Sequence, residues 1–167
     1  MIAAKEVLTW PDERLRQVCA PVTEFGDALR SFVADMEAVM RSGPAAVGIA
    51  APQVGCLRRV VIVDASARKG RNHGRLVLVN PEIVSWDGSV KGREGCLSVP
   101  DMTGNVVRAQ NIAIECVDEY GRPQSYEMSH FEARVVQHEL DHLDGLLFLD
   151  RVVSRRSDLF KRSPEAK

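Results

Sequence analysis

The residues with the clearest chemistry lie in one short stretch of the chain. His138-Glu139-Leu140-Asp141-His142 has the pattern HExxH. On a helix, residues i and i+4 share one face, so both imidazoles could bind one metal ion at about 2.0–2.1 Å. Glu139 would then lie beside the metal without binding it. The pattern alone is only moderately specific, because a solvated helix without any metal can carry the same residues.

Two histidines do not complete a catalytic metal site, which usually has three protein ligands and a water. No histidine follows His142, and Phe148 stands where the extended HExxHxxGxxH pattern would have its third histidine. The carboxylates downstream are Asp150 and Asp158. Upstream, Cys96 lies between a glycine and a short apolar run, where a strand or tight turn could bring its thiolate to the helix. From the residues alone, a buried cysteine without a metal remains the alternative.

The HExxH pattern lies within a predicted helix of about residues 130–143. Ser129 and Glu132 have the spacing of a capping box, and Gly145 stands where a helix often ends. Two opposite faces of this helix carry apolar or functional residues, so we expect a central helix with sheet around it. One face has Phe131, Val135, His138 and His142, and the other has Ala133, Val136, Leu140 and Leu143.

The rest of the chain predicts one further helix and several strands. Residues 27–41 have apolar residues at helical spacing, with Asp27 as a cap and Gly43-Pro44 as a stop. Short apolar runs predict strands at 57–63 and 76–79, and a hairpin joins 111–117 to 124–128. We read 66–74, 85–92 and 118–123 as loops. These elements favour an α+β fold in a single domain over 1–167, with mainly antiparallel strands around the central helix and the first helix outside.

The charge balance, the apolar runs and the cysteines of the chain argue against several classes of protein. The 22 Lys and Arg nearly balance the 23 Asp and Glu, which argues against direct sequence-specific binding of nucleic acid. No apolar run is long enough to span a membrane, and no signal or transit sequence is recognisable. The remaining cysteines, Cys19, Cys56 and Cys116, lack CxxC spacing and are expected to be buried, reduced thiols. We therefore expect a cytoplasmic protein, with the bacterial cytosol favoured.

Three segments, in this order, resemble the signature motifs of peptide deformylases. They are Gly48-Ile49-Ala50-Ala51-Pro52-Gln53, Glu94-Gly95-Cys96-Leu97-Ser98 and Gln137-His138-Glu139-Leu140-Asp141-His142-Leu143. The likeness extends to 11–16 with Pro21-Val22, and to Asn80-Pro81. It implies an enzyme that removes the formyl group from the N-formyl-methionine of new polypeptides.

The resemblance also implies how the reaction is carried out. Cys96, His138 and His142 would hold one divalent metal ion, with Fe(II) expected natively and zinc, nickel or cobalt able to replace it. A metal-bound water would act as the nucleophile, because coordination lowers its pKa from 15.7 towards about 7. Glu139 would accept its proton and pass it to the leaving amine. The Gln53 amide and the Leu97 backbone N–H would stabilise the charge on the formyl oxygen.

Further residues match the family's substrate contacts. Val47 and Gly48 would offer a strand edge to the substrate backbone, and Glu94 and Gly95 are also expected to contact the substrate. The side chains of Val47, Phe131 and Val135 would line the methionine pocket, although Phe131 and Val135 fit a plain core role as well.

One ion pair matches the family pattern, and the residues at three other positions differ from it. Glu94 and Arg108 match an ion pair that braces the metal loop, though two such charges could equally be solvated. Ala46 replaces a frequent glycine, Thr103 a frequent arginine, and Arg134 an apolar residue. We expect these departures to affect the local backbone, the contact beyond the first substrate residue and the pocket entrance, with activity retained.

The carboxy-terminal segment 150–167 is basic, with six Lys or Arg against three Asp or Glu. We interpret it as a solvated, partly disordered end, in which Pro164 limits any helix to about 159–162; a weak ribosome contact is the alternative. Two other functions stay open at this point. One is a small HExxH metalloprotease, and the other is a deformylase-like protein that binds ligands without turnover.

Overall fold

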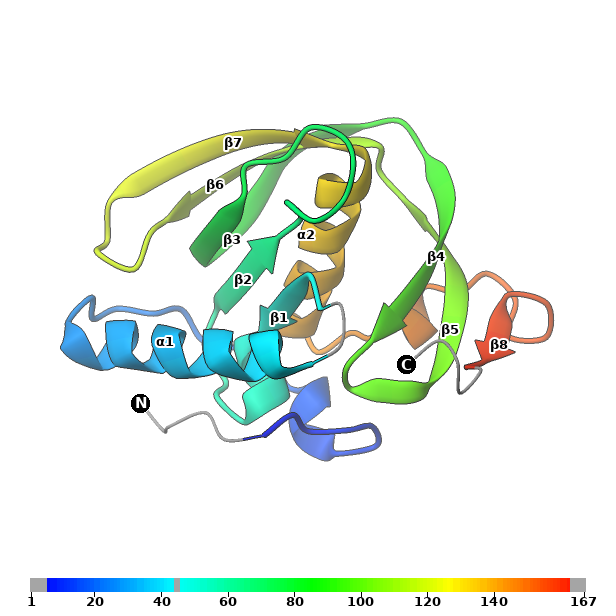
Figure 1. The fold of residues 1–167 in the computed structure, drawn as a ribbon, viewed down its shortest axis with the longest axis horizontal. Helices are drawn as coiled ribbons and strands as arrows, with labels where there is room; N and C mark the ends of the chain where they lie inside the picture. The colour runs from blue at the N-terminus through cyan, green and yellow to red at the C-terminus, as the bar shows by residue number, and fades with distance from the viewer. Residues whose placement is uncertain (1–5, 44–45, 163–167) are drawn as a thin grey trace.

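The computed structural model describes residues 6–43 and 46–162. A long helix, α2 (His130–Leu143), lies between a five-stranded and a three-stranded sheet (Figure 1). The larger sheet has the order β1-β2-β3-β6-β7, and the smaller has the order β4-β5-β8. All pairings between these strands are antiparallel, which confirms the predicted α+β architecture.

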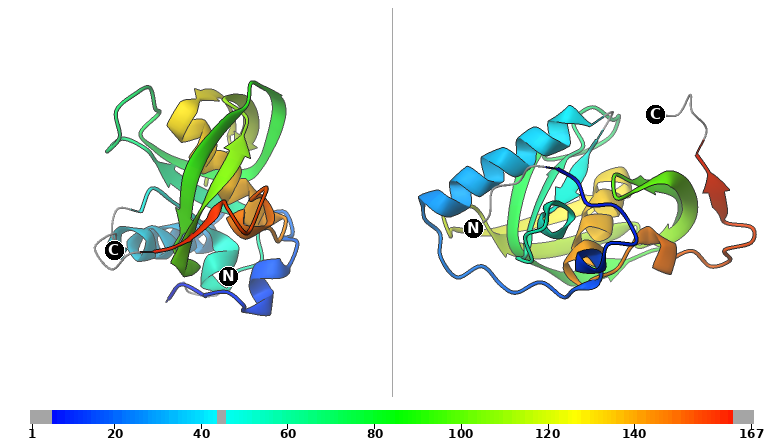
Figure 2. Two further views of the ribbon diagram at one scale, coloured as in Figure 1. Left: turned by 90° about the vertical axis from the view of Figure 1, so that its right-hand side faces the viewer. Right: turned by 90° about the horizontal axis from the view of Figure 1, so that it is seen from below.

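The larger sheet has its two faces covered by different helices. Its strands are β1 (Gly48–Ala50), β2 (Val60–Asp64), β3 (Arg75–Asp87), β6 (Asn111–Val117) and β7 (Pro123–Ser129). Side chains of a strand alternate between faces, and on β2 Val61 and Val63 pack in the cluster that contains the apolar face of α2. Val60 and Ile62 pack in the second cluster, with α1 (Asp27–Ser42). The sheet is therefore buried on both faces at its centre, and α1 lies on the outside as predicted (Figure 2).

The two predicted helices and the hairpin are confirmed with small changes at their ends. The α2 helix spans the predicted residues, and Gly145 follows it with φ +76°. The hairpin of β6 and β7 pairs Asn111 with Ser129 and Val117 with Pro123. The first helix begins at Asp27, but Gly26 occupies the N-cap position. Pro44, the other half of the predicted stop signal, lies outside the described residues.

The capping box predicted at Ser129 and Glu132 is wrong. Ser129 is the N-cap residue, but its side chain makes no capping hydrogen bond. The Glu132 carboxylate instead accepts a hydrogen bond from the backbone N–H of His73 at 2.7 Å and contacts the His73 ring at 2.6 Å. Glu132 is 2% exposed, so a partner distant in sequence has replaced the local one.

The predicted loop at 85–92 is also wrong. The strand β3 continues to Asp87, and β4 (Val90–Cys96) begins after a turn at Gly88, whose φ is +74°. From Glu82 to Asp87 every residue of β3 is exposed. This half of the strand therefore lacks the alternation of buried and exposed residues by which a strand is recognised in a sequence.

The smaller sheet includes part of the carboxy-terminal segment, which the sequence predicted to be solvated and partly disordered. Its β4 pairs with β5 (Val99–Arg108), and β8 (Leu159–Lys161) pairs with Met102, Thr103 and Gly104 of β5. The prediction of a solvated end with a short helix at 159–162 is thus wrong for the described part of the tail. Residues 163–167 lie outside the described residues.

Candidate metal centre and active site

Cys96, His138 and His142 come together although the cysteine lies 42 residues before the first histidine. Cys96 is the last residue of β4, and the register of the β4–β5 pair shifts between Gly95 and Cys96. This irregularity lies where β4 meets α2. One ligand atom from each of the three side chains lies within 4.8 Å of the others, and all three residues are buried.

The donor set suits a divalent transition metal. The Cys96 Sγ lies 3.4 Å from Nε2 of His142. A tetrahedral metal with ordinary metal–sulfur and metal–nitrogen bonds would hold such atoms about 3.5 Å apart. Burial keeps the pKa of His142 well below its usual value, so the ring is neutral and has a lone pair to donate. A thiol with two imidazoles is a ligand set for zinc or iron rather than for magnesium or calcium.

Glu139 lies next to these ligands with one oxygen free. Its Oε1 is buried without a hydrogen-bond partner among the described residues, and it lies 4.0 Å from Nε2 of His142. Burial raises the pKa of Glu139 to about 7, and the charge of a bound cation would oppose this rise. A water held between the metal and this carboxylate would satisfy the orphan oxygen, so the residues present fit a catalytic metal.

Glycine at position 48 allows β1 to approach Glu139 closely. A Cβ built on Gly48 would lie 2.6 Å from Oε2 of Glu139 and 3.0 Å from Cγ1 of Val135. Real Cβ atoms do not come so close to other heavy atoms, so no larger side chain fits without displacing the carboxylate. The strand β1 is also an edge of the five-stranded sheet, as predicted, and its outer side is free of another strand among the described residues.

Gln53 is held with its amide group directed at the cysteine loop. Its Oε1 accepts a hydrogen bond from the Ala50 N–H at 2.9 Å, which orients the amide. Its Nε2 donates to Ser98 Oγ at 3.0 Å and to Cys96 Sγ at 3.5 Å. Ser98 is fully buried and was not singled out in the sequence, although it belongs to the second motif.

A buried charge network connects His138 to the smaller sheet. Arg108 donates two hydrogen bonds to Glu94, each of 2.9 Å, and Glu94 also binds Nδ1 of His138 at 2.9 Å. Burial opposes ionisation of Glu94, but the hydrogen bonds from His138 and Arg108 outweigh it and keep the pKa of this carboxyl well below its usual value. The contact leaves Nε2 of His138 free for a metal.

Two residues that the sequence did not assign to this network take part in it. Asp141, inside the HExxH pattern, accepts from Arg108 at 2.6 Å and from Arg151 at 2.9 Å. Arg134, expected to affect the pocket entrance, also donates to Glu94 at 2.7 Å and to two backbone carbonyls of the β4–β5 pair. Both residues could have been found from their helical spacing, i+3 and i−4 relative to His138.

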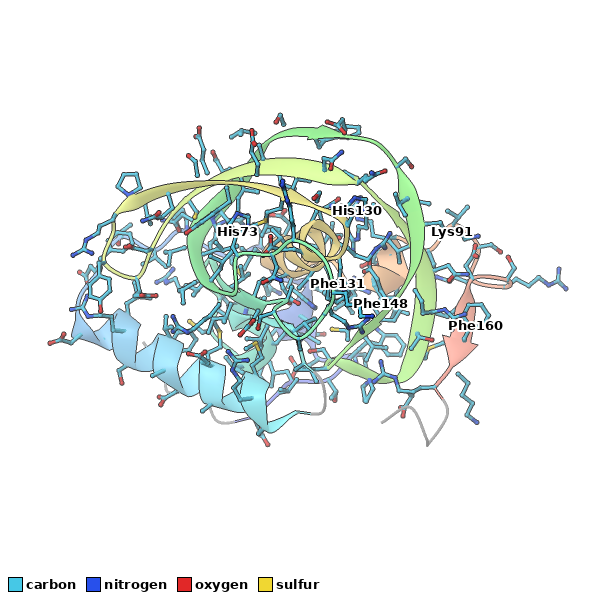
Figure 3. The ribbon with its side chains drawn as sticks, turned by 45° about the horizontal axis from the view of Figure 1, so that its top comes forward. His73, Lys91, His130, Phe131, Phe148 and Phe160 are labelled. Atoms are coloured by element: carbon cyan, nitrogen blue, oxygen red, sulfur yellow. The ribbon has the colours of Figure 1, made fainter. Side chains whose placement is uncertain are left out.

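A cavity of about 310 Å³ opens over these groups. Its wall includes each predicted substrate contact and catalytic residue, together with two of the three proposed ligands: Val47, Gly48, Gln53, Glu94, Gly95, Cys96, Leu97, Phe131, Val135, His138 and Glu139. His142 lies deeper, and Ala46, Thr103 and Arg134 also line the cavity. Figure 3 labels Phe131, near the start of α2 at the centre of the molecule, and Phe160 on β8 at the right of the view.

Comparison with known proteins agrees with the motifs. The family model described as polypeptide deformylase matches residues 4–158. The chain belongs to the peptide deformylase family. A peptide deformylase of Alkalilimnicola ehrlichii is 40% identical over 98% of this chain and 90% of its own length. Peptide deformylase 1 of Bacillus subtilis is 41% identical over 90% and 91%, respectively.

Solved structures support the same deformylase fold. A crystal structure of peptide deformylase from Thermotoga maritima matches with a TM-score of 0.83 and 32% identity, over 92% of this chain and 100% of that one. Another, from Synechococcus elongatus in complex with actinonin, matches with a TM-score of 0.83 and 34% identity, over 93% and 86%. The family assignment decides against the small HExxH metalloprotease. No helix in the described part of the chain has the length and apolar character needed to cross a bilayer.

Proposed function

We propose that the chain is a single-domain, metal-dependent hydrolase that removes the formyl group from N-formyl-methionine of newly made polypeptides and releases formate. The observation that carries this proposal is the buried Cys96, His138 and His142 cluster with the unpartnered Glu139 oxygen beside it, in a member of the peptide deformylase family. Fe(II) is the proposed native ion, and zinc, nickel or cobalt would fit the same donors.

In this proposal the catalytic residues act on a water and on the formyl group. A bound divalent cation would supply a water whose pKa is low enough for attack at neutral pH. Glu139 takes the proton of this water and delivers it to the amine that leaves. The Gln53 Nε2 group and the Leu97 N–H donate hydrogen bonds to the formyl oxygen as it gains negative charge.

The substrate would lie along the edge strand β1, with its backbone near Val47 and Gly48 on one side and near Glu94 and Gly95 on the other. The cavity wall formed by Phe131 and Val135 is apolar and would receive the methionine side chain. Backbone pairing imposes little sequence preference, which suits an enzyme that acts on many nascent chains. We place this activity in the cytoplasm, during translation.

The test is an assay of formate release from formyl-Met-Ala-Ser by anaerobically purified protein with its metal content measured. Glu139→Gln should retain the metal and lose at least about 100-fold in kcat, because general acid–base catalysis contributes roughly 10²–10⁴-fold. Glu115→Gln, on the exposed face of β6, serves as the matched control and should keep full activity. No formate from the metal-loaded protein would mean a binding protein without turnover, and cleavage between Ala and Ser would mean a protease.

Contact with the ribosome is a separate part of the proposal. Arg155 and Arg156 are exposed and precede β8, so they offer positive charge to ribosomal RNA. Replacing both by Gln should reduce co-sedimentation with ribosomes at low salt while leaving formate release from a tripeptide unchanged. Equal co-sedimentation of the variant and the original protein would contradict this contact.

A further inference from the structure

Four arginines reach the cavity above the metal centre from four different segments. Arg68 comes from the loop before β3, Arg93 from β4, Arg134 from α2 and Arg162 from the residue after β8. The carboxylates in the cavity wall are Glu94 and Glu139. These two carboxylates are the groups of the wall that could neutralise the positive charges.

Arg134 is neutralised by Glu94, which lies 2.7 Å away. Glu94 is also the partner of Arg108 and His138, so it has no capacity left for another cation. Glu139 faces the proposed metal ligands and is 5% exposed. Arg68, Arg93 and Arg162 have no carboxylate partner among the described residues, and the rim of the cavity is therefore positively charged.

Arg93 is held in place by neutral groups. Its guanidinium stacks on Phe160 of β8, with 3.7 Å between the guanidinium carbon and the ring centre. Its nitrogens donate to the side-chain oxygens of Asn105 and Thr103, both at 3.2 Å. These contacts fix the orientation of the guanidinium without cancelling its charge. A pre-positioned guanidinium loses little side-chain entropy when it binds an anion.

Arg162 lies directly against Gly95, the residue before Cys96. Its guanidinium occupies the place where a side chain at position 95 would begin. The pairing of β8 with β5 and a hydrogen bond of 2.8 Å from the Arg162 N–H to the Asp101 carbonyl set the position of its backbone. The charge of Arg162 therefore lies one residue from a proposed metal ligand, and the tail supplies part of the site.

Arg68 completes the rim from another segment. Its guanidinium stacks on Phe131, with 4.6 Å between the guanidinium carbon and the ring centre. Phe131 belongs to the apolar wall proposed for the methionine side chain. The residues that follow the formyl-methionine in a bound peptide would therefore lie near positive charge at the rim of the cavity.

We propose that Arg93 and Arg162 form a subsite that favours an acidic side chain at the second or third residue of the formyl peptide, with Arg68 adding to the local field. This inference rests on the proposed deformylase function. The carboxylate of Asp or Glu suits the donor pattern of a guanidinium. The subsite changes preference among substrates, whereas Glu139 and the metal ligands determine whether any substrate reacts.

The test compares peptides that differ in one charge. Formyl-Met-Asp-Ser and formyl-Met-Asn-Ser, and formyl-Met-Ala-Asp and formyl-Met-Ala-Asn, are all used as C-terminal amides so that no other carboxylate competes. We expect kcat/KM to be about 5-fold higher for one or both acidic peptides at low salt, mainly through KM, since partly exposed ion pairs give modest effects. At 1 M salt the ratio should fall below about 2, because the Debye length is about 3 Å there.

Variants then locate the effect. Arg93→Gln and Arg162→Gln should each reduce the acidic-to-amide ratio, and the double variant should bring it to about 1. Arg162→Lys should restore part of the ratio, and Arg162→Glu should favour formyl-Met-Lys-Ser-amide instead. Arg156→Gln removes an exposed tail charge outside the cavity and is the matched control, with an unchanged ratio.

Three results would overturn the subsite. The first is an equal kcat/KM for each acidic peptide and its amide partner in the original protein. The second is an acidic preference that Arg156→Gln reduces as much as Arg162→Gln does. A ratio unchanged in the double variant is the third. Loss of formate release from every peptide by the metal-loaded protein would instead contradict the deformylase function itself.

Discussion

At the scale of single residues, the site depends on groups that hold the proposed metal ligands in place. Glu94 is 6% exposed and contacts the imidazole of His138, a proposed metal ligand, as well as Arg108 and Arg134. Such a carboxylate fixes the orientation and tautomer of the histidine, and it balances two guanidinium charges in a low-dielectric region. Glu94 would therefore affect the affinity for a metal indirectly, by orienting His138.

Replacing Glu94 with Gln should therefore weaken metal binding by about 10–100-fold. It should also lower the free energy of unfolding by roughly 3 kcal/mol, because Arg108 and Arg134 lose a buried anion. Chelator competition measures the first effect and urea unfolding the second. Glu82→Gln, at an exposed position of β3, is the control, and unchanged metal affinity in Glu94→Gln would contradict the brace.

The thiols outside the site give a prediction that depends on pH. Burial raises the pKa of both Cys19 and Cys116 to about 11. Their neutral form is favoured in the folded protein, so the contribution to stability is complete below the pKa of the unfolded thiol, near 9, and is lost as the pH rises towards 11. At pH 8 only about one thiol in a thousand would be ionised at each site, and thiolate is the reactive form.

Iodoacetamide at pH 8 should therefore leave Cys19 and Cys116 largely unmodified in the folded protein, as measured by peptide mass spectrometry. In 6 M guanidinium chloride, where unfolding removes the burial, the same residues should react fully. Fast modification of either thiol in the native protein would show that its surroundings open far more often than its burial indicates.

At the scale of elements, glycines decide how closely two segments approach. Gly145 has φ +76° after α2, and a Cβ there would lie 2.5 Å from the Arg16 carbonyl oxygen. Gly48 has no backbone strain, but it lies against Glu139. A side chain added at Gly145 should therefore reduce stability, and one added at Gly48 should reduce activity.

Gly145→Ala should lower the free energy of unfolding by about 2 kcal/mol or more, because the left-handed conformation and the close carbonyl both oppose a side chain. Gly26→Ala is the control, since an added Cβ there meets no atom of the described residues within 4 Å, and its cost should stay below about 1 kcal/mol. Urea unfolding measures both variants. Equal costs at the two positions would contradict the close packing of Gly145 against Arg16.

Gly48→Ala should lower kcat/KM for formyl-Met-Ala-Ser by at least about 10-fold, because the new methyl group displaces the Glu139 carboxylate, and small misplacements of a catalytic group are costly. Metal content and the midpoint of urea unfolding are measured in parallel. We expect the metal to be retained, since the three atoms nearest to the added Cβ belong to Glu139 and Val135 and not to a proposed ligand. Full activity would show that Glu139 adapts to the added group.

At the scale of the whole molecule, the fold does not depend on its metal for a core. One apolar cluster fills the space between α2 and the larger sheet, and a second fills the space between that sheet and α1. A domain of this length buries enough surface to fold without a structural metal. A metal bound at the proposed site would add stability on top of this core, because it would bind only the folded state.

Removing the metal should therefore lower the Tm without unfolding the protein at 25 °C. A ligand at 1,000 times its Kd adds about 4 kcal/mol. For a chain of this size that corresponds to roughly 10 °C. Calorimetry with and without a chelator measures the shift, and circular dichroism at 25 °C checks the fold. Unfolding of the chain on chelation would mean that the metal is structural. In Cys96→Ser the chelator should change the Tm much less.

The sequence by itself determined the parts of this protein that local patterns encode. The period of the apolar residues predicted α1, and the short runs around a turn predicted the β6–β7 hairpin. Gly145 correctly predicted the end of α2, although the capping box expected at its start does not form. The three motifs named the family and the candidate ligands. The HExxH spacing placed both histidines on one helix face, since residues i and i+4 are neighbours on any helix.

Only the tertiary structure decided what depends on partners distant in the chain. The Glu132 carboxylate binds His73 and does not cap α2 as expected. The exposed residues 82–87 continue the strand β3, and residues 159–161 pair with β5. Arg162 reached Gly95 as a result. Strand pairing and buried ion pairs gain their free energy from residues that are close only after folding, so no local pattern records them.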